Sequence, residues 1–557
     1  MTTSTAQAAS TAYPYPLLIK QLWHAPLARW PDQEIVYREL KRYRYRDLHE
    51  RVGRLANALT ALGTAFGDTV AVMDWDSNRY LEAFYAVPMM GSVLQTVNVR
   101  LSPEQILYTL NHAGAKVLLV HADFLPVLAE IAPRLTTVEK LVFMSDEGQT
   151  APAQLGFAGE YEALLAQASA DYDFPDFDEN TRATTFYTTG TTGDPKGVFF
   201  SHRQLVLHTI VTMAALAAPA SSQRFHRGDV YMPITPMFHV HAWGIPYVAL
   251  QLGVKQVYPG RYQPDGLLEL IHREGVTFSH CVPTILQMLL STPKAQEVDL
   301  HGWKVIIGGS ALSHGLASEA RDRGIDLFGG YGMSETGPLL TLAQLDPKLD
   351  VASPEDDLHF RCKAGAPVPL VDLRTVDEHM RDVPLDGETA GEVVVRAPWL
   401  TQGYLGNPAA SEQLWAGGYL HTQDIGYFEQ GYLKVTDRIK DVIKSGGEWV
   451  SSVQIEDLLS QHPAVAETAV FAVKDERWGE RPLALVVLKA GQTASEDDFK
   501  AHLAHFSEQG MISRYAVPVR VLLVDAIDKT SVGKLDKKRL RAKYADVQDH
   551  IPKGEIP

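Results

Sequence analysis

Short apolar runs alternate with amphipathic, helix-like segments along most of this chain. The apolar run 68–76 (DTVAVMDWD) precedes a helical pattern at 78–91, and the run 303–311 (WKVIIGGSA) precedes another at 315–324. Apolar strands that are bounded by turns and alternate with helices predict parallel sheets covered by helices. In such sheets ligands bind at the loops that follow the strands.

The pattern changes near residue 436. Beyond it, the order helix, two strands, helix, strand and basic helix predicts a compact unit with its own core. We therefore predict an α/β protein with a large N-terminal domain of parallel-rich sheets covered by helices (1–436). A boundary at 437–440 separates it from a small α+β C-terminal domain (441–557).

Composition narrows the classes of function. The chain has 557 residues and a formal charge of −16, which disfavours binding to a nucleic-acid backbone. Its only cysteines, Cys281 and Cys362, lack metal-site spacing and fit a reducing compartment. The apolar window 205–220 is too short for a membrane span, and the N-terminus lacks a signal-peptide pattern. We expect a soluble, cytoplasmic protein.

The segment 187–197, YTTGTTGDPKG, has the composition of a phosphate-binding loop. Glycines let the backbone N–H groups approach phosphate closely, and Lys196 adds a positive charge. The loop is not a Walker A motif, because Gly197 follows Lys196 where that motif has a Ser or Thr ligand for magnesium. A flexible surface turn is the alternative interpretation.

The segment 328–338, FGGYGMSETGP, offers a second group of candidates. Tyr331 provides a flat ring for stacking on a base, and Glu335 is an oxygen ligand suited to Mg²⁺. Taken alone, the segment could equally be a strand-to-helix turn in which Ser334 serves as a cap.

Two further segments carry polar candidates. Asp424 could accept hydrogen bonds from two ribose hydroxyls and Arg438 could donate to the same sugar, although both could lie on an ordinary surface β-meander. Lys440 and Lys444 could belong to a solvated charged face. Lys534 follows Gly533 on a loop that could enter a cleft, whereas most lysines in such a tail only add solubility.

Taken together and in this order, the motifs resemble those of the adenylate-forming superfamily of acyl-CoA synthetases, adenylation domains and luciferases. The motifs are YTTGTTGDPKG, GGYGMSETGP, DRIKDVIKSGGEW and SVGKLDKKRLR, and the match spans nearly the whole chain. The segments PMFHVHAWGIPY and IKSGGEWVSS are most similar to medium- and long-chain fatty-acyl-CoA synthetases. The resemblance implies a mobile C-terminal domain with a hinge at 437–440.

The resemblance also implies a role for each matching residue. Magnesium would be held by Thr188 and Glu335, and the phosphates of ATP by Thr188, Thr189, Gly190, Thr191, Thr192, Gly193 and Lys196. Adenine would be framed by Gly309, Gly329, Gly330 and Tyr331, with Ser334 near the α-phosphate and with Asp424 and Arg438 at the ribose. The acid would meet His239, Trp243 as a gate to the acyl tunnel, and Lys534, which bridges carboxylate and phosphate. Lys440 would be the hinge residue, and Lys444 and Trp449 would meet the nucleotide or the thioester-forming site.

Two departures from the family pattern concern local turns. Gln423 stands where the family usually has glycine before the ribose-binding Asp424, and DKT at 528–530 replaces a common PRT before the lysine loop. Trp243 could also be an ordinary core residue. His239 and His241 would share one face of a strand, but a metal site is disfavoured because no further His or Cys lies nearby in sequence.

The predicted activity is an ATP-dependent, AMP-forming carboxylic acid:CoA ligase, with a medium- or long-chain fatty acid as substrate. ATP, Mg²⁺ and coenzyme A are the expected cofactors and co-substrates, and a homodimer is a possible assembly. An aryl, terpenoid or short thio-substituted acid is an alternative substrate. An enzyme that passes its acyl group to a carrier protein or to oxygen, and a nucleotide-binding regulator without turnover, are alternative functions.

Overall fold

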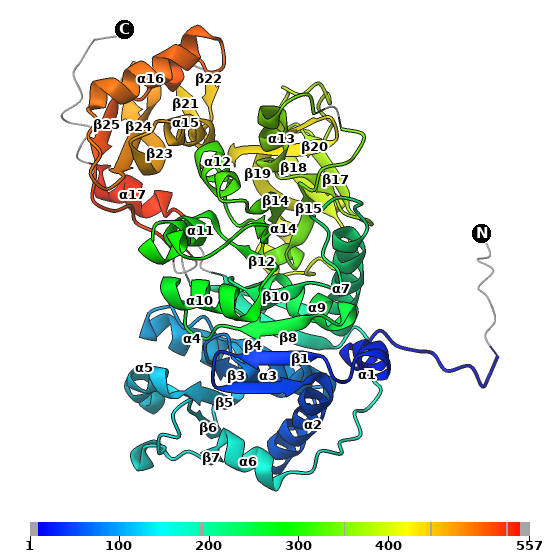
Figure 1. Cartoon of the computed structure of the whole chain (residues 1–557). Coiled ribbons are helices and arrows are strands. Elements are labelled where there is room, and N and C mark those ends of the chain that lie inside the picture. The colour runs from blue at the N-terminus through cyan, green and yellow to red at the C-terminus, as the bar shows by residue number, and fades with distance from the viewer. Residues whose placement is uncertain are drawn as a thin grey trace.

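The computed structural model describes residues 9–188, 194–349, 351–445, 448–475, 477–530 and 533–545, with the backbone alone at 448 and 449 (Figure 1). Two large sheets and one small sheet form the N-terminal part, and a separate sheet with three helices forms the C-terminal part. The small C-terminal domain, orange and red in Figure 1, lies beside α11 and α12 of the large domain.

The first sheet has seven strands, and every neighbouring pair is parallel except β8 and β9. In spatial order they are β7 (Gly159–Glu160), β6 (Lys140–Met144), β5 (Ala115–His121), β3 (Thr69–Met73), β4 (Val93–Thr96), β8 (Arg182–Thr188) and β9 (Lys196–Ser201).

The second sheet has nine strands with a parallel centre and antiparallel pairs at both ends. In spatial order they are β16 (Ala366–Pro367), β15 (Leu339–Leu342), β14 (Asp326–Gly332), β13 (Lys304–Ile307), β12 (Phe278–Cys281), β10 (Val230–Pro233), β11 (Lys255–Tyr258), β1 (Glu34–Tyr37) and β2 (Lys41–Arg44). The predicted parallel-rich α/β architecture is confirmed.

The alternation of strand and helix does not extend to residue 436. After β16 the chain forms an antiparallel sheet of four strands, β17 (Asp372–Val376), β18 (Gly391–Arg396), β19 (Leu420–Glu429) and β20 (Tyr432–Arg438). A tight turn between β19 and β20 makes them a hairpin, for which no crossover helix is needed. The segment that carries Asp424 and Arg438 is therefore a β-meander.

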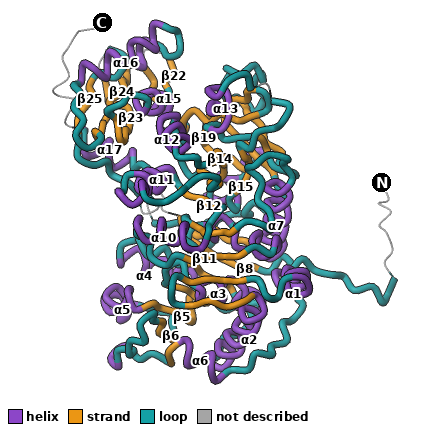
Figure 2. Tube along the Cα trace, in the orientation of Figure 1, coloured by secondary structure: helices purple, strands orange, loops and turns teal. Residues whose placement is uncertain are grey.

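The helices of the large domain cover the sheets (Figure 2). They are α1 (His24–Arg29), α2 (Tyr45–Ala61), α3 (Asn78–Met89), α4 (Pro103–Ala113), α5 (Leu125–Ile131), α6 (Tyr161–Gln167), α7 (His202–Ala217), α8 (Val240–Trp243), α9 (Ile245–Leu252), α10 (Pro264–Glu274), α11 (Pro283–Leu290), α12 (His314–Asp322), α13 (Pro354–Arg361) and α14 (Pro408–Leu414). The apolar window 205–220 falls largely in α7, and among the described residues no helix is long and apolar enough to cross a membrane.

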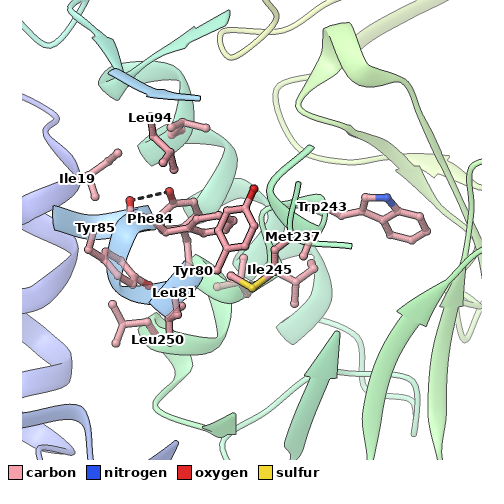
Figure 3. Packing of buried hydrophobic residues seen from close by; sticks show 14 of the residues in the cluster. Ile19, Tyr80, Leu81, Phe84, Tyr85, Leu94, Met237, Trp243, Ile245 and Leu250 are labelled. Atoms are coloured by element: carbon pink, nitrogen blue, oxygen red, sulfur yellow. Dashed lines mark hydrogen bonds between the residues drawn. The ribbon is translucent and has the colours of Figure 1, made fainter. Parts of the chain in front are cut away.

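Helix α3 forms the centre of the core. All of its residues are buried, and it contacts strands of both large sheets. A helix buried on every side is apolar all round, as the sequence NRYLEAFYAVPM nearly is. Its Glu82 is neutralised by Arg51, whose Nε lies 2.7 Å from Oε1. Tyr80, Phe84 and Tyr85 of this helix pack against aliphatic side chains from several elements (Figure 3).

The C-terminal domain contains the predicted elements in the predicted order. They are α15 (Ser452–Ser460), β23 (Val465–Asp475), β24 (Gly479–Leu488), α16 (Glu496–Glu508), β25 (Arg520–Leu523) and α17 (Lys537–Lys543). An additional hairpin, β21 (Ile443–Ser445) with β22 (Glu448–Val450), extends the same sheet. The chain leaves the four-stranded sheet at Arg438 and enters this sheet at Ile443.

Candidate active site

A cavity lies where the ends of β13 and β14 meet the loop before α17. Its wall combines glycine backbone with apolar and polar side chains from both domains, and it is lined by His239, Val240, Trp243, Ile245, Ile306, Gly308, Gly309, Gly330, Tyr331, Gly332, Met333, Ser334, Pro338, Leu339 and Lys534. Since strand ends of a parallel sheet meet at one edge, residues far apart in sequence converge here.

The expected ribose-binding pair is assembled around Tyr331. The Tyr331 hydroxyl donates to Asp424 Oδ2 at 2.7 Å, and Arg438 Nε lies 3.2 Å from Asp424 Oδ1. Asp424 and Arg438 face each other across β19 and β20. Burial raises the pKa of the Asp424 carboxyl, and the Arg438 guanidinium opposes that shift. Tyr331 lines the cavity, and it connects the cavity to the Asp424 carboxylate and the Arg438 guanidinium, which do not line it themselves.

Glu335 is held in a fixed orientation by Tyr404, a residue that the sequence motifs did not single out. The Tyr404 hydroxyl donates to Glu335 Oε1 at 2.7 Å, and Lys196 Nζ lies 4.7 Å from the centre of the Tyr404 ring. Glu335 is buried and its charge acts on Lys534 and Arg438, although no direct ion pair of Glu335 is seen among the described residues. A buried carboxylate that forms no direct ion pair retains oxygens that fit a bound cation such as Mg²⁺.

Thr188 and Lys196 stand opposite each other where β8 meets β9. The Tyr404 backbone bridges to Val198 of β9, and the Tyr404 hydroxyl bonds to Glu335, so β9 lies close to the Glu335 segment. The expected phosphate ligands Thr189, Gly190, Thr191, Thr192 and Gly193 lie outside the described residues.

Lys534 is the contribution of the C-terminal domain to the cavity. Its loop docks on α11 through Thr284 Oγ1, which donates to the Gly533 carbonyl at 2.9 Å. Gly309 has φ +82°, and a Cβ at that position would lie 3.2 Å from Lys534 Cε. Burial and the neighbouring Arg438 lower the pKa of Lys534 to about 8. The ammonium therefore sits in a partly desolvated site beside the cavity.

His239 and Trp243 line the apolar end of the cavity. Burial and the charge of Lys534 lower the pKa of His239 to about 3, which keeps its ring neutral at physiological pH. The Trp243 indole stacks on His280, with ring centroids 4.9 Å apart. Trp243 thus lines the cavity and also packs against a buried side chain of the core.

The two histidines of the PMFHVHAW segment do not share the face of a strand. Val240, His241, Ala242 and Trp243 all have φ between +48° and +58°, a left-handed turn. His241 is buried among Phe84, Phe186 and Phe200 instead. Among the described residues there is no cluster of three or more His, Cys, Asp or Glu that could hold a metal.

Several expected site residues do not line the cavity. A Cβ on Gly329 would meet the Lys363 carbonyl at 2.1 Å, so this glycine is required by strand packing. Lys440 is exposed beyond β20, and Lys444 and Trp449 pair with each other across β21 and β22. Figure 1 places that hairpin on the side of the small domain away from α17. The roles given to these residues stay predictions.

The structure accommodates both departures from the family pattern. Gln423 has φ +61°, the left-handed conformation that a glycine adopts without strain, and its carbonyl accepts a hydrogen bond from Ile439 N at 2.9 Å. Lys529 forms an ion pair with Glu467 at 2.9 Å, and the Thr530 N–H donates to the Lys534 carbonyl at 2.7 Å. The altered loop is held by contacts within the C-terminal domain, and it still places Lys534 at the cavity.

Two known protein families match this chain. The family described as "AMP-binding enzyme" matches residues 23–405, and its C-terminal domain family matches residues 454–534. The chain belongs to the AMP-binding enzymes. This AMP-binding enzyme is 40% identical over 510 residues to a long-chain-fatty-acid–CoA ligase of Thermus thermophilus, covering 91% of each chain. It is 39% identical over 498 residues to a 3-methylmercaptopropionyl-CoA ligase of Ruegeria pomeroyi, covering 89% of this chain and 90% of that one.

A solved structure agrees with the architecture of this AMP-binding enzyme. ATP-bound MatB from Rhodopseudomonas palustris has a TM-score of 0.81 and 25% identity, covering 96% of this chain and 100% of that chain. Its relatives place this AMP-binding enzyme among the AMP-forming acid–thiol ligases.

Proposed function

We propose that this acyl-CoA ligase activates a medium- or long-chain fatty acid, using ATP, Mg²⁺ and coenzyme A. The observation that carries the proposal is the convergence of Lys534, His239 and Tyr331 on one cavity whose remaining wall is largely apolar. A carboxylate could enter beside Lys534 while its alkyl chain contacts Val240, Ile245 and Leu339.

The nucleotide would be held mainly by the large domain. Asp424 and Arg438 would bind the ribose, and the backbone of Gly309 and Gly330 would allow the adenine to approach closely. Thr188 and Glu335 would hold Mg²⁺, which supplies charge neutralisation for the triphosphate when bound. The contact of Tyr404 with both Glu335 and Lys196 supports a common site for metal and phosphates.

The chemistry follows from the poor leaving group of a free carboxylate. An oxygen of the carboxylate attacks the α-phosphorus of ATP, and the bond to the pyrophosphate oxygen breaks. The products of this half-reaction are acyl-AMP and pyrophosphate. Lys534 would offset the repulsion between the two anions, the kind of fixed electrostatic contribution that dominates such reactions. The thiolate of coenzyme A then attacks the acyl carbon and releases AMP.

The two half-reactions need different groups at the same site. Lys534 occupies the cavity in the present arrangement, whereas Lys444 and Trp449 lie on another face of the small domain. We therefore propose that a rotation about 437–440, with Lys440 as the hinge residue, exchanges these faces between adenylation and thioester formation. A homodimer and a cytoplasmic location remain part of the proposal.

A short thio-substituted acid is the second candidate substrate. It is favoured by the position of Trp243, whose indole closes the apolar end of the cavity against His280. The relative from Ruegeria pomeroyi, named for such a substrate, adds support.

Acid-dependent exchange of pyrophosphate into ATP tests the proposed function. The panel comprises straight-chain acids from acetate to hexadecanoate, 3-methylmercaptopropionate and benzoate, with and without coenzyme A. We expect exchange to be strongest with a straight-chain acid of medium or greater length and thioester to form when coenzyme A is added. Absence of exchange with every acid would contradict adenylation, and adenylate formation without thioester would favour transfer to another acceptor.

A further inference from the structure

The Trp243 indole rests on a stack of buried rings behind the cavity. His280 of β12 is fully buried and does not line the cavity. Its imidazole is nearly parallel to the Trp243 indole, with an interplanar angle of 29°, and to the Tyr231 ring, with an angle of 19°. His280 Nε2 and the Tyr231 hydroxyl form a hydrogen bond of 2.8 Å. The imidazole is thus fixed between two aromatic rings.

The space beyond His280 is also filled with aromatic side chains. Tyr231 contacts Phe225 at 6.1 Å between ring centroids, and Phe225 stacks on Phe278 at 4.1 Å. All three are fully buried. Because protein interiors are close-packed, an acyl chain cannot continue in this direction while the rings stay in place.

The Trp243 indole is carried by a strained backbone segment. Trp243 has φ +58° at the end of the left-handed turn α8, a conformation that non-glycine residues rarely adopt. Figure 3 shows the indole directed away from the side chains packed around Tyr80 and Phe84. The indole stacks on His280, and a Cβ on Gly308 would lie 3.0 Å from the indole edge. The stack on His280 therefore helps to hold this strained segment in position.

We propose that His280 is a specificity-determining residue that seats the Trp243 indole and thereby sets the length of the acyl chain that the pocket accepts. This proposal rests on the proposed acid:CoA ligase function. With the imidazole present, the pocket ends at the indole, and this end sets the longest acid that fits without rearrangement. Longer acids must displace the indole from its seat. Removing the imidazole creates a cavity into which the indole can move, and it lengthens the pocket.

The test compares the acid preference of wild type, His280→Ala and His280→Phe by pyrophosphate exchange. The readout is the ratio of kcat/KM for dodecanoate to kcat/KM for butanoate, because a general loss of folded enzyme cancels in this ratio. We expect His280→Ala to raise the ratio at least tenfold. His280→Phe retains a flat ring for the indole and should keep the ratio within threefold of wild type.

The outcomes separate this proposal from the function on which it rests. The proposal that His280 seats the indole is refuted if a folded, active His280→Ala enzyme keeps the wild-type ratio of the two kcat/KM values. It is also refuted if His280→Phe raises this ratio as much as His280→Ala does. If His280→Ala is insoluble, His280→Asn removes the ring but retains a hydrogen-bonding group for Tyr231, and the same tenfold rise is expected. A wild-type enzyme without exchange on any acid instead overturns the proposed function.

Discussion

Tyr404 connects two charged residues that the motifs place far apart in sequence. Its hydroxyl orients Glu335 and its ring lies against Lys196. Neither contact could be predicted from the sequence, because both depend on the bridge between Tyr404 and Val198 of β9. By contrast, the sequence motifs predict functional roles for Asp424, Arg438, Glu335 and Lys534. The structure brings Asp424 and Arg438 together, and it places Lys534 in the cavity.

We predict that Tyr404→Phe weakens the use of magnesium. The phenyl ring retains the contact with Lys196 but cannot donate to Glu335, and a hydrogen bond to a charged group contributes roughly 1.5–3 kcal/mol. The Mg²⁺ concentration for half-maximal pyrophosphate exchange should rise about tenfold, since 1.4 kcal/mol corresponds to a factor of ten. Tyr419→Phe, which removes a hydroxyl bonded to Asp372 on the surface, is the control. Identical magnesium curves for wild type and Tyr404→Phe would refute the orienting role.

We predict that the rate of adenylation depends on pH through the protonation of Lys534. Its pKa is lowered from 10.5 to about 8, so the ammonium is protonated below that pH and loses its charge as the pH rises. We expect kcat/KM for pyrophosphate exchange to fall about tenfold per pH unit above pH 8. Lys534→Arg keeps its charge at these pH values, and its residual activity should lack this decline. The same decline in Lys534→Arg would assign the titration to another group.

The turn α8 is the element that sequence reasoning misjudged. Its residues Val240, His241, Ala242 and Trp243 disfavour left-handed conformations, so propensity gave no sign of this turn. Helix α3 illustrates the opposite case, because the helical pattern at 78–91 predicts the helix that the structure has at Asn78–Met89. The antiparallel sheet β17–β20 was not part of the predicted architecture, although a β-meander was the alternative interpretation of the segment with Asp424 and Arg438. Apolar runs alone do not distinguish meander strands from strands followed by crossover helices.

We predict that Ala242→Gly destabilises the protein less than Ala83→Gly. Both alanines are fully buried, but Ala83 lies in the right-handed helix α3 whereas Ala242 has φ +48° and ψ +47°. A left-handed residue other than glycine costs roughly 1–2 kcal/mol, which the glycine relieves. The urea midpoint of Ala83→Gly should therefore lie below that of Ala242→Gly. The reverse order would show that α8 is not strained.

Polar contacts between the two domains include one that holds the loop of Lys534. Thr284 holds the lysine loop, and Asp457 of α15 accepts a hydrogen bond from the His314 N–H of α12 at 2.7 Å. The sequence predicted both domains and the elements of the small one. It could not predict how the domains dock, because that arrangement depends on contacts between distant residues, such as Thr284 and Gly533, which are 249 positions apart.

We predict that Thr284→Val slows adenylation while leaving thioester formation unchanged. Valine keeps the shape of threonine but cannot donate to the Gly533 carbonyl, and a neutral hydrogen bond contributes roughly 0.5–1.5 kcal/mol. Single-turnover formation of acyl-AMP should fall about threefold to tenfold. Thr292→Val, whose hydroxyl bonds only to the local Leu289 carbonyl among the described residues, is the matched control. Equal slowing of both half-reactions by Thr284→Val would contradict a contact specific to adenylation.

The most direct test of the account measures the two half-reactions of Lys534→Ala separately. Lys543→Ala is the control, since Lys543 lies on the same domain in an exposed ion pair with Asp528. We predict that Lys534→Ala loses at least a hundredfold in acyl-AMP formation from acid and ATP. The same variant should convert preformed acyl-AMP and coenzyme A to thioester at nearly the wild-type rate. Equal loss of both half-reactions, or full adenylation without Lys534, would contradict this prediction.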